Sequence, residues 1–148
     1  PRCEKKVNAK KSMMIFHLGE YLVIQLKRFK SDLYGRQQKI HGKVDFPMES
    51  LSLANNTPKI NKNTALYDLQ AVTNHSGGLQ GGHYIALVRS EHNGEWYECD
   101  DNHIFYVPKE KVKSTVCSDE AYILYYKRRV EKEEAKEYES DSDESDFE

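Results

Sequence analysis

One histidine and two adjacent aspartates are the residues of this sequence best suited to chemistry. His83 begins a predicted strand directly after a glycine-rich run, and Asp100 and Asp101 end the next predicted strand. A histidine that is oriented by a carboxylate on a neighbouring strand supplies two members of a Cys-His-Asp or Ser-His-Asp triad. A histidine near a strand end is more often structural, so the hypothesis depends on whether the two strands bring these side chains together.

The length of the loop between these strands decides whether His83 can reach either aspartate. If the Asn-Gly pair at 93–94 formed a two-residue turn, Asp100 would lie about 13 Å along the strands from His83, too far for a hydrogen bond. A loop of four or six residues places Asp100 on the same face as His83 and within reach, whereas a loop of five residues offers Asp101 instead. The chemistry therefore predicts a connection longer than the Asn-Gly pair suggests.

The run before the histidine holds four glycines in six residues. Because they have no side chains to fill the space, Gly77, Gly78, Gly81 and Gly82 allow another backbone to approach closely. We interpret this run as a loop beside the site. A histidine at the first residue of the following strand would be held by a rigid element and still be open to a ligand.

The body of the chain is predicted to be mostly β-structure. Segment 21–29 is apolar and β-branched, the pattern of a strand buried on both faces. Residues 108–113 begin with a proline and are compatible with one helical turn. Further strand candidates, separated by clusters of Gly, Asn, Asp and Pro, lie at 13–18, 66–74, 83–90, 95–99, 103–107 and 121–127.

Charge divides the 148 residues into a basic body and an acidic tail. The formal net charge is −2, but residues 131–148 carry −8 and residues 1–130 therefore carry +6. The tail has almost no apolar side chains to bury. We expect one domain part over 1–129 and a disordered acidic tail over 130–148.

Several classes of function are disfavoured by what the sequence lacks. The basic clusters at 27–30 and 125–129 are short and match no nucleic-acid-binding module. No apolar run approaches the roughly 18 residues of a membrane span, and the first residues lack the apolar core of a signal peptide. Three cysteines at irregular spacing do not form a secreted disulfide framework. We expect an intracellular protein, cytoplasmic or nuclear or both, that binds neither nucleic acid nor membrane.

Four segments, taken in order, carry a family resemblance. They are LVIQLKRF (22–29), LYDLQAVTNHSGGLQGGHYIALV (66–88), EWYECDDNHIF (95–105) and AYILYYKRR (121–129). This ordered set resembles the second half of the catalytic domain of a ubiquitin-specific protease, a peptidase C19-type deubiquitinase. The resemblance implies an α+β fold, mainly antiparallel β in this chain, of the papain-like cysteine protease type. The chain would supply the sheet half and part of the finger region.

The resemblance also implies a role for each candidate residue. His83 would be the general base, Asp100 would orient it, and Asp101 would assist or help to stabilise the oxyanion. Residues 75–82 and 30–42 resemble the two loops that line the channel for the ubiquitin tail. The candidates for contact with that tail or for support of the channel are His75, Gly77, Gly78, Gly81, Gly82 and Tyr84.

Two of these candidates have alternative interpretations. His75 would contact the ubiquitin tail or, equally well, face solvent from its loop. Tyr84, which follows the base, would mainly support the channel.

The nucleophile that the resemblance requires is not found in this sequence. In that family it lies in an N-terminal cysteine box, and none of the three cysteines here has that context. Cys99 is expected to be a small core residue and Cys117 an ordinary loop thiol. Cys3 resembles the second cysteine of a C-x-x-C pair in the finger region. Half a pair cannot close a four-ligand zinc site, so Cys3 is at most a weak zinc-ligand candidate and otherwise a free thiol.

The resemblance therefore predicts a deubiquitinase that hydrolyses the peptide or isopeptide bond after the C-terminal glycine of ubiquitin. The chain would supply the His and Asp of a Cys-His-Asp triad, so it should be inactive alone. Its partners would be ubiquitin, ubiquitinated proteins and the Cys-bearing half of the same domain. The chemistry needs no cofactor, although the intact domain is compatible with a structural zinc.

Two other classes of protein remain open as alternatives. The first is a non-catalytic ubiquitin-binding or scaffolding module, which the missing nucleophile favours. The second is an unrelated β domain in which His83 and Asp100 make only a structural hydrogen bond.

Overall fold

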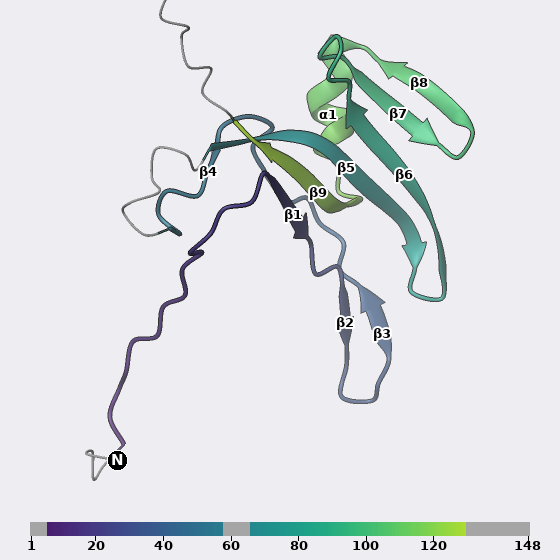
Figure 1. Cartoon of the computed structure of the whole chain (residues 1–148). Helices are drawn as coiled ribbons and strands as arrows, with labels where there is room; N and C mark the ends of the chain where they lie inside the picture. The colour runs from purple at the N-terminus through teal and green to yellow at the C-terminus, as the bar shows by residue number, and fades with distance from the viewer. Residues whose placement is uncertain (1–5, 58–65, 130–148) are drawn as a thin grey trace, which may run out of the picture.

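The structure is a computed structural model that describes residues 6–57 and 66–129. One antiparallel sheet dominates this part of the chain (Figure 1). Its strands are β1 (Tyr21–Gln25), β4 (Leu51–Ser52), β5 (Leu66–Gly78), β6 (Gly81–Arg89), β7 (Trp96–Asp100), β8 (His103–Val107) and β9 (Ala121–Arg128). A separate ribbon consists of β2 (Phe29–Ser31) and β3 (Gln37–Lys39), and a short helix, α1 (Val112–Val116), follows a 3₁₀ turn at Lys109–Lys111.

The strand order across the sheet is β1-β9-β5-β6-β7-β8, with β4 beside the first residues of β5. Strands β5 to β8 form a meander, and β9 returns to lie between β5 and β1. The meander makes β6 and β7 immediate neighbours. The strand that carries His83 therefore lies beside the strand that ends at Asp100.

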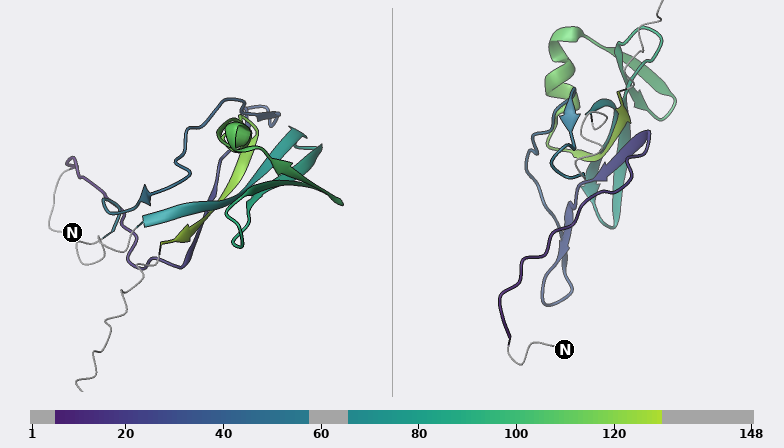
Figure 2. Two further views of the ribbon diagram at one scale, coloured as in Figure 1. Left: turned by 90° about the horizontal axis from the view of Figure 1, so that it is seen from above. Right: turned by 60° about the vertical axis from the view of Figure 1, so that its left-hand side comes forward.

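The sheet packs one of its faces and leaves the other more open. Leu124, Val72, Leu87 and Trp96 lie on β9, β5, β6 and β7 in turn, and each is at most 6% exposed. The helix α1 lies over one side of the sheet (Figure 2) and adds the buried Val116 to the same hydrophobic cluster. In an antiparallel sheet with one packed face, buried and exposed side chains alternate along each strand.

The prediction for segment 21–29 is wrong in its length and its burial. Strand β1 covers only the first five of these residues, and the last residue belongs to β2. Within the described residues β1 is an edge strand, with Tyr21 and Val23 both 58% exposed. The continuous apolar run therefore combines one packed face with one open face. The strand predicted at 13–18 does not form.

The remaining predicted strands are confirmed, with small shifts at their ends except for β5, which runs four residues further than expected. The helical turn predicted at 108–113 forms as the 3₁₀ turn and continues into α1. The predicted acidic tail at 130–148 lies outside the described residues. Across the described parts of the chain, no helix is long and apolar enough to cross a membrane.

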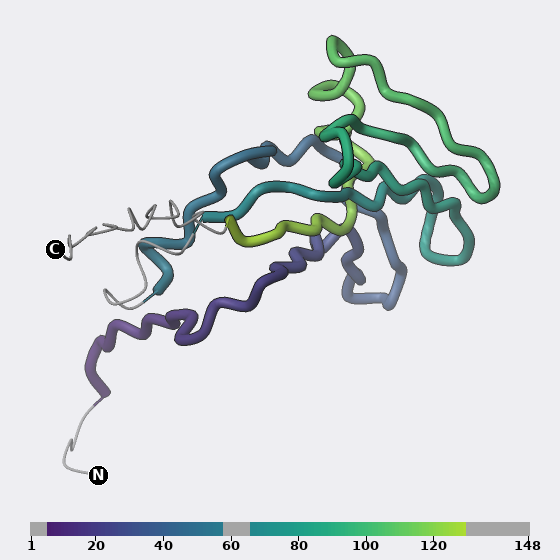
Figure 3. The backbone as a smooth tube through the Cα atoms, turned by 45° about the horizontal axis from the view of Figure 1, so that its top comes forward, coloured from purple at the N-terminus to yellow at the C-terminus, as the bar shows by residue number. Residues whose placement is uncertain are grey.

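Two hairpins extend from the same end of the sheet, as Figures 1 and 3 both show. One is the β5–β6 hairpin, in which Gly78 pairs with Gly81 at the tip. The other is the β2–β3 hairpin, in which Phe29 pairs with Lys39 at the base. These hairpins are far apart in sequence, and the fold brings their tips to the two sides of one groove.

Candidate active site

Strands β6 and β7 bring His83 and Asp100 together at one end of the sheet. A four-residue loop, 91–94, joins the two strands. The Ser90 N–H donates to the Glu95 carbonyl (2.8 Å), so these two residues face each other where the loop closes, and the ladder continues from there. This is one of the two loop lengths that the register argument requires, and the two-residue turn does not form. The His83 Nε2 lies 2.5 Å from the Asp100 Oδ1, within hydrogen-bonding distance.

Asp101 forms a compact cluster with these two residues. It lies in the tight turn between β7 and β8, with φ at +48°, a conformation that residues with side chains rarely adopt. One ring nitrogen of His83 and one carboxylate oxygen of each aspartate lie within 4.8 Å of one another. Such a set also contains donors for a metal ion, but the His83 Nε2 is already bonded to Asp100. Asp101 is close enough for its negative charge to act on the His83 imidazole, whereas Asp100 makes the hydrogen bond to it.

The neighbouring carboxylates stabilise the protonated form of His83 relative to an isolated imidazole. The hydrogen bond to Asp100, together with the charge of that carboxylate, raises the pKa of His83, and Asp101 adds to the increase. With Nε2 donating to Asp100, Nδ1 is the nitrogen that remains to accept a proton. Both side chains are partly open to solvent, His83 at 47% and Asp100 at 38%. The pair has the geometry of a general base with its orienting carboxylate.

The glycine-rich run is the tip of a hairpin and not the loop that the sequence suggests. Strand β5 continues to Gly78 and β6 begins at Gly81, so only residues 79–80 form the turn. The interpretation of 75–82 as a loop is therefore wrong. His83 is the third residue of its strand, and it is held in the ladder opposite Ser76.

The four glycines of this hairpin fall into two pairs. A Cβ at Gly82 would lie less than 3.0 Å from the His75 ring and from a backbone oxygen, and a Cβ at Gly77 would meet the opposite strand just as closely. At Gly78 and Gly81 nothing lies within 4 Å of such an atom. Gly77 and Gly82 therefore permit close packing within the hairpin, whereas Gly78 and Gly81 keep its tip open.

His75 is buried, so a solvent-facing position is wrong for it. Only 4% of the residue is exposed, and its partner in the ladder is Tyr84. Its imidazole centroid lies 4.7 Å from that of Tyr84, which is itself 54% exposed and packs over it. Four rings meet here and form what we call the aromatic cluster: Phe29, His75, Tyr84 and Tyr122.

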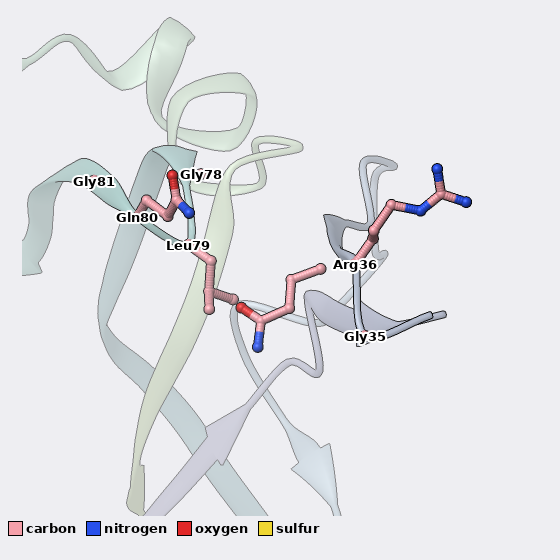
Figure 4. A pocket seen from close by; sticks show the side chains of 7 residues that line it. Gly35, Arg36, Gly78, Leu79, Gln80 and Gly81 are labelled. Carbon is pink, nitrogen blue, oxygen red and sulfur yellow. The ribbon is translucent and has the colours of Figure 1, made fainter. Parts of the chain in front are cut away.

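A groove of about 570 Å³, which we call the hairpin groove, separates the tips of the two hairpins (Figure 4). Figure 4 shows the Leu79 side chain directed toward the β2–β3 hairpin, while the Arg36 guanidinium points away from the gap. A further hollow of about 360 Å³ is lined by the aromatic cluster and the β5–β6 tip. The walls of the hairpin groove are Gly35, Arg36 and Gln37 on one side and Gly78, Leu79, Gln80 and Gly81 on the other.

Neither described cysteine is placed to react with His83. Cys99 and Asp100 are consecutive residues of β7, so strand alternation directs their side chains to opposite faces. Cys117 ends α1, is buried, and has a thiol pKa that burial raises. Cys3 lies outside the described residues, and its weak candidacy as a zinc ligand stays a prediction.

A sheet that places a His-Asp pair on neighbouring strands, beside a groove between two hairpins, has an arrangement also found in hydrolases that use a nucleophile and a base. The comparisons identify which kind. The ubiquitin carboxyl-terminal hydrolase family matches residues 1–126. Ubiquitin carboxyl-terminal hydrolase 9 of Arabidopsis thaliana is 38% identical over 128 residues, which are 86% of this chain and 14% of that protein. Ubiquitin carboxyl-terminal hydrolase 15 of Bos taurus is 34% identical over 129 residues, 87% of this chain and 13% of that protein.

Solved structures agree with the sequence matches. A structure of the yeast SAGA DUB module superposes with a TM-score of 0.66 at 30% identity, covering 79% of this chain and 25% of that one. The SAGA Ubp8/Sgf11/Sus1/Sgf73 DUB module bound to ubiquitin aldehyde also gives 0.66 at 30% identity, covering 79% and 26%. The chain belongs to the ubiquitin carboxyl-terminal hydrolase family, of the ubiquitin-specific protease type, and its sheet matches part of the papain-like fold. It spans about 14% of the length of the curated relatives reported above.

Proposed function

We propose that this chain carries the general base and its orienting residue for a cysteine-type deubiquitinase. The observation that supports this most directly is the 2.5 Å contact between His83 Nε2 and Asp100 Oδ1, next to the open tip of the β5–β6 hairpin. Relatives that share the fold are deubiquitinases, and one similar module was solved with ubiquitin aldehyde bound. The substrate is therefore ubiquitin joined through its C-terminal glycine to an amine.

The mechanism follows from the two nitrogens of His83. Its Nδ1 takes the proton of a cysteine thiol, and the thiolate attacks the carbonyl carbon of the terminal glycine. The imidazolium then gives that proton to the departing lysine amine, which leaves a thioester. His83 next removes a proton from water, whose attack releases ubiquitin and regenerates the thiol. Asp100 holds the tautomer through Nε2 and stabilises the charged ring at each step.

Asp101 has a supporting role in this scheme. Its carboxylate raises the pKa of His83 by its charge. The residue lies in the tight turn between β7 and β8, with a positive φ. An ionised carboxylate repels an oxyanion, so of the two roles considered for Asp101 we keep assistance to the base. The hairpin groove, with its open glycines, is the channel for the extended ubiquitin tail.

The nucleophile in this proposal comes from a Cys-bearing lobe outside this sequence. The thiols of Cys99 and Cys117 are directed away from His83 or buried. A His-Asp pair moves protons but forms no acyl-enzyme without a thiol. The 148-residue chain is consequently inactive alone, and its partners are ubiquitin, ubiquitinated proteins and that lobe. The reaction requires no cofactor.

The test is cleavage of a ubiquitin-rhodamine substrate by the full-length protein that contains this chain. His83→Ala should lower kcat/KM by about three orders of magnitude or more, because the base is lost. His92→Ala is the matched control, since His92 is an exposed residue of the β6–β7 loop, and it should retain activity within about twofold. Binding of ubiquitin without cleavage, in the presence of intact His83 and Asp100, would instead identify the non-catalytic module.

A further inference from the structure

We propose that Lys39 is a positioning residue that sets the width of the hairpin groove by fastening the β2–β3 hairpin to β5. Its ammonium group donates a hydrogen bond to the His75 carbonyl at 2.5 Å. Lys39 is the last residue of β3 and His75 lies near the tip of β5, so this contact links the two hairpins directly. The effect on substrate rests on the proposed function, whereas the fastening itself does not.

The His75 carbonyl is available because the β5–β9 ladder ends just before it. The last pair of that ladder joins Asn74 to Ala121, after a register shift. Beyond this point the His75 N–H donates to the Glu120 carbonyl (3.0 Å), and the ladder offers no partner for its own carbonyl. A backbone carbonyl in a buried residue needs a donor. Lys39 supplies that donor from a distant part of the sequence.

The base of the β2–β3 hairpin is held at a second point by Arg28. This side chain is 5% exposed; its Nε donates to the Ala121 carbonyl (3.0 Å) and its Nη1 to the Gly42 carbonyl (2.5 Å). The Arg28 carbonyl in turn accepts from the Ile40 N–H (2.6 Å). Arg28 thus fixes the pivot of the hairpin, and Lys39 fixes its orientation about that pivot.

The tip of the hairpin is braced by hydrogen bonds of its own. Asp32 accepts hydrogen bonds from the Tyr34 N–H, the Arg36 N–H and the Arg36 Nε, each at 2.8 Å. Lys39 lies four positions along the chain from Gly35 at the groove wall, a distance of about 13 Å in an extended strand. A rotation of about 10° at the base would therefore move this wall by about 2 Å, roughly the radius of a methyl group.

The charge of Lys39 also affects the pKa of His75. Burial lowers the pKa of this histidine, the Lys39 charge lowers it further, and Glu120 opposes both. Removal of the lysine charge should therefore raise the pKa of His75. This readout separates the contact of Lys39 from any general effect on the fold.

The experiment compares Lys39→Met, which removes the donor, with Lys39→Arg, which keeps a cation. The matched control is Lys27→Met just before the same hairpin, because the Lys27 side chain is exposed, lies outside residues 30–42, and makes no hydrogen bond or ion pair with other described residues. NMR on the 148-residue chain follows the His75 titration and the exchange of the Ile40 N–H. Kinetics on the full-length protein follow cleavage of ubiquitin-rhodamine.

Lys39→Met should raise the pKa of His75 and speed exchange of the Ile40 amide about tenfold, since the hairpin base loosens. It should raise KM about tenfold and change kcat less than twofold, because the lysine touches neither His83 nor Asp100. Lys39→Arg and Lys27→Met should stay within about twofold of the wild type in every measurement.

If the His75 titration and the Ile40 exchange are unchanged in Lys39→Met, Lys39 does not hold the β2–β3 hairpin to β5. Global unfolding of Lys39→Met would overturn the fastening as well, because the contact would then support the whole sheet and not one hairpin. If the full-length protein cleaves no ubiquitin substrate, the proposed function fails, and the NMR measurements still decide on Lys39. Equal losses in kcat and kcat/KM would contradict a role confined to the groove.

Discussion

Alanine at Gly82 should destabilise the protein, whereas alanine at its neighbour Gly81 should not. The two glycines are consecutive residues of β6 in the same hairpin. A Cβ at Gly82 would lie less than 3.0 Å from the His75 ring and from the Ser76 carbonyl oxygen. A Cβ at Gly81 would have no neighbour within 4 Å. The pair therefore separates the packing role of this hairpin from its role as a groove wall.

The size of the effect follows from what must move. The Ser76 oxygen belongs to the paired strand, and the His75 ring is buried within the aromatic cluster, so neither can yield without opening the hairpin. Overpacking of this kind costs about 1–3 kcal/mol. With a typical dependence on urea, that lowers the unfolding midpoint by about 1 M. Gly81→Ala should be neutral or stabilise by up to about 1 kcal/mol, because the unfolded chain loses freedom.

Fluorescence of Trp96 provides the assay. It is the single tryptophan of the chain, it is 6% exposed, and it lies on β7 beside the strand under test. Urea unfolding of the wild type and both variants should give three curves in which only Gly82→Ala is shifted to lower urea. Equal midpoints for Gly81→Ala and Gly82→Ala would refute the assignment of Gly82 to close packing. It would restore the simpler view that all four glycines only line the channel.

Two further predictions concern His83, Asp100 and the proposed missing nucleophile. Asp100→Asn should move the acid limb of the kcat/KM profile to lower pH, since the carboxylate that raises the pKa of His83 is gone, and Asp100→Ala should lose more activity because no acceptor remains for Nε2. An unmoved acid limb would show that the limb reports another group. The isolated 148-residue chain should not be labelled by a ubiquitin-based thiol-reactive probe, and labelling that disappears when Cys3, Cys99 or Cys117 is mutated would place the nucleophile within this chain.

The pairing of His83 with Asp100 could be predicted because it depends on parity. Residues two apart on a strand share a face, so only the loop length was open. The Asn-Gly pair favours a two-residue turn, but here both residues lie within the four-residue loop 91–94. The Asn93 side chain accepts from the Glu95 N–H (3.0 Å), and Gly94 adopts φ +73°. The local preference is satisfied, and the register is determined by the strands on either side.

Burial could not be predicted where it depends on distant segments. His75 reads as a loop residue because glycines follow it, yet rings from β2 and β9 cover it. Segment 21–29 reads as a central strand because its side chains are apolar on both faces, yet β1 has one partner among the described strands. In both places the local sequence indicates how polar the segment is. The exposure of its side chains depends on which distant strands pack against it.

This division between local and distant contacts has a consequence for the enzyme. His83 and Asp100 are placed by one meander, and residues 17 apart in sequence are enough to orient the base. The groove is placed by contacts across much longer separations, such as Arg28 to Ala121, 93 residues apart. Variants that disturb the pairing of β6 with β7 at His83 and Asp100 should therefore act on the chemical step and change kcat. Variants at the base of the β2–β3 hairpin should act on how the substrate tail is held and change KM.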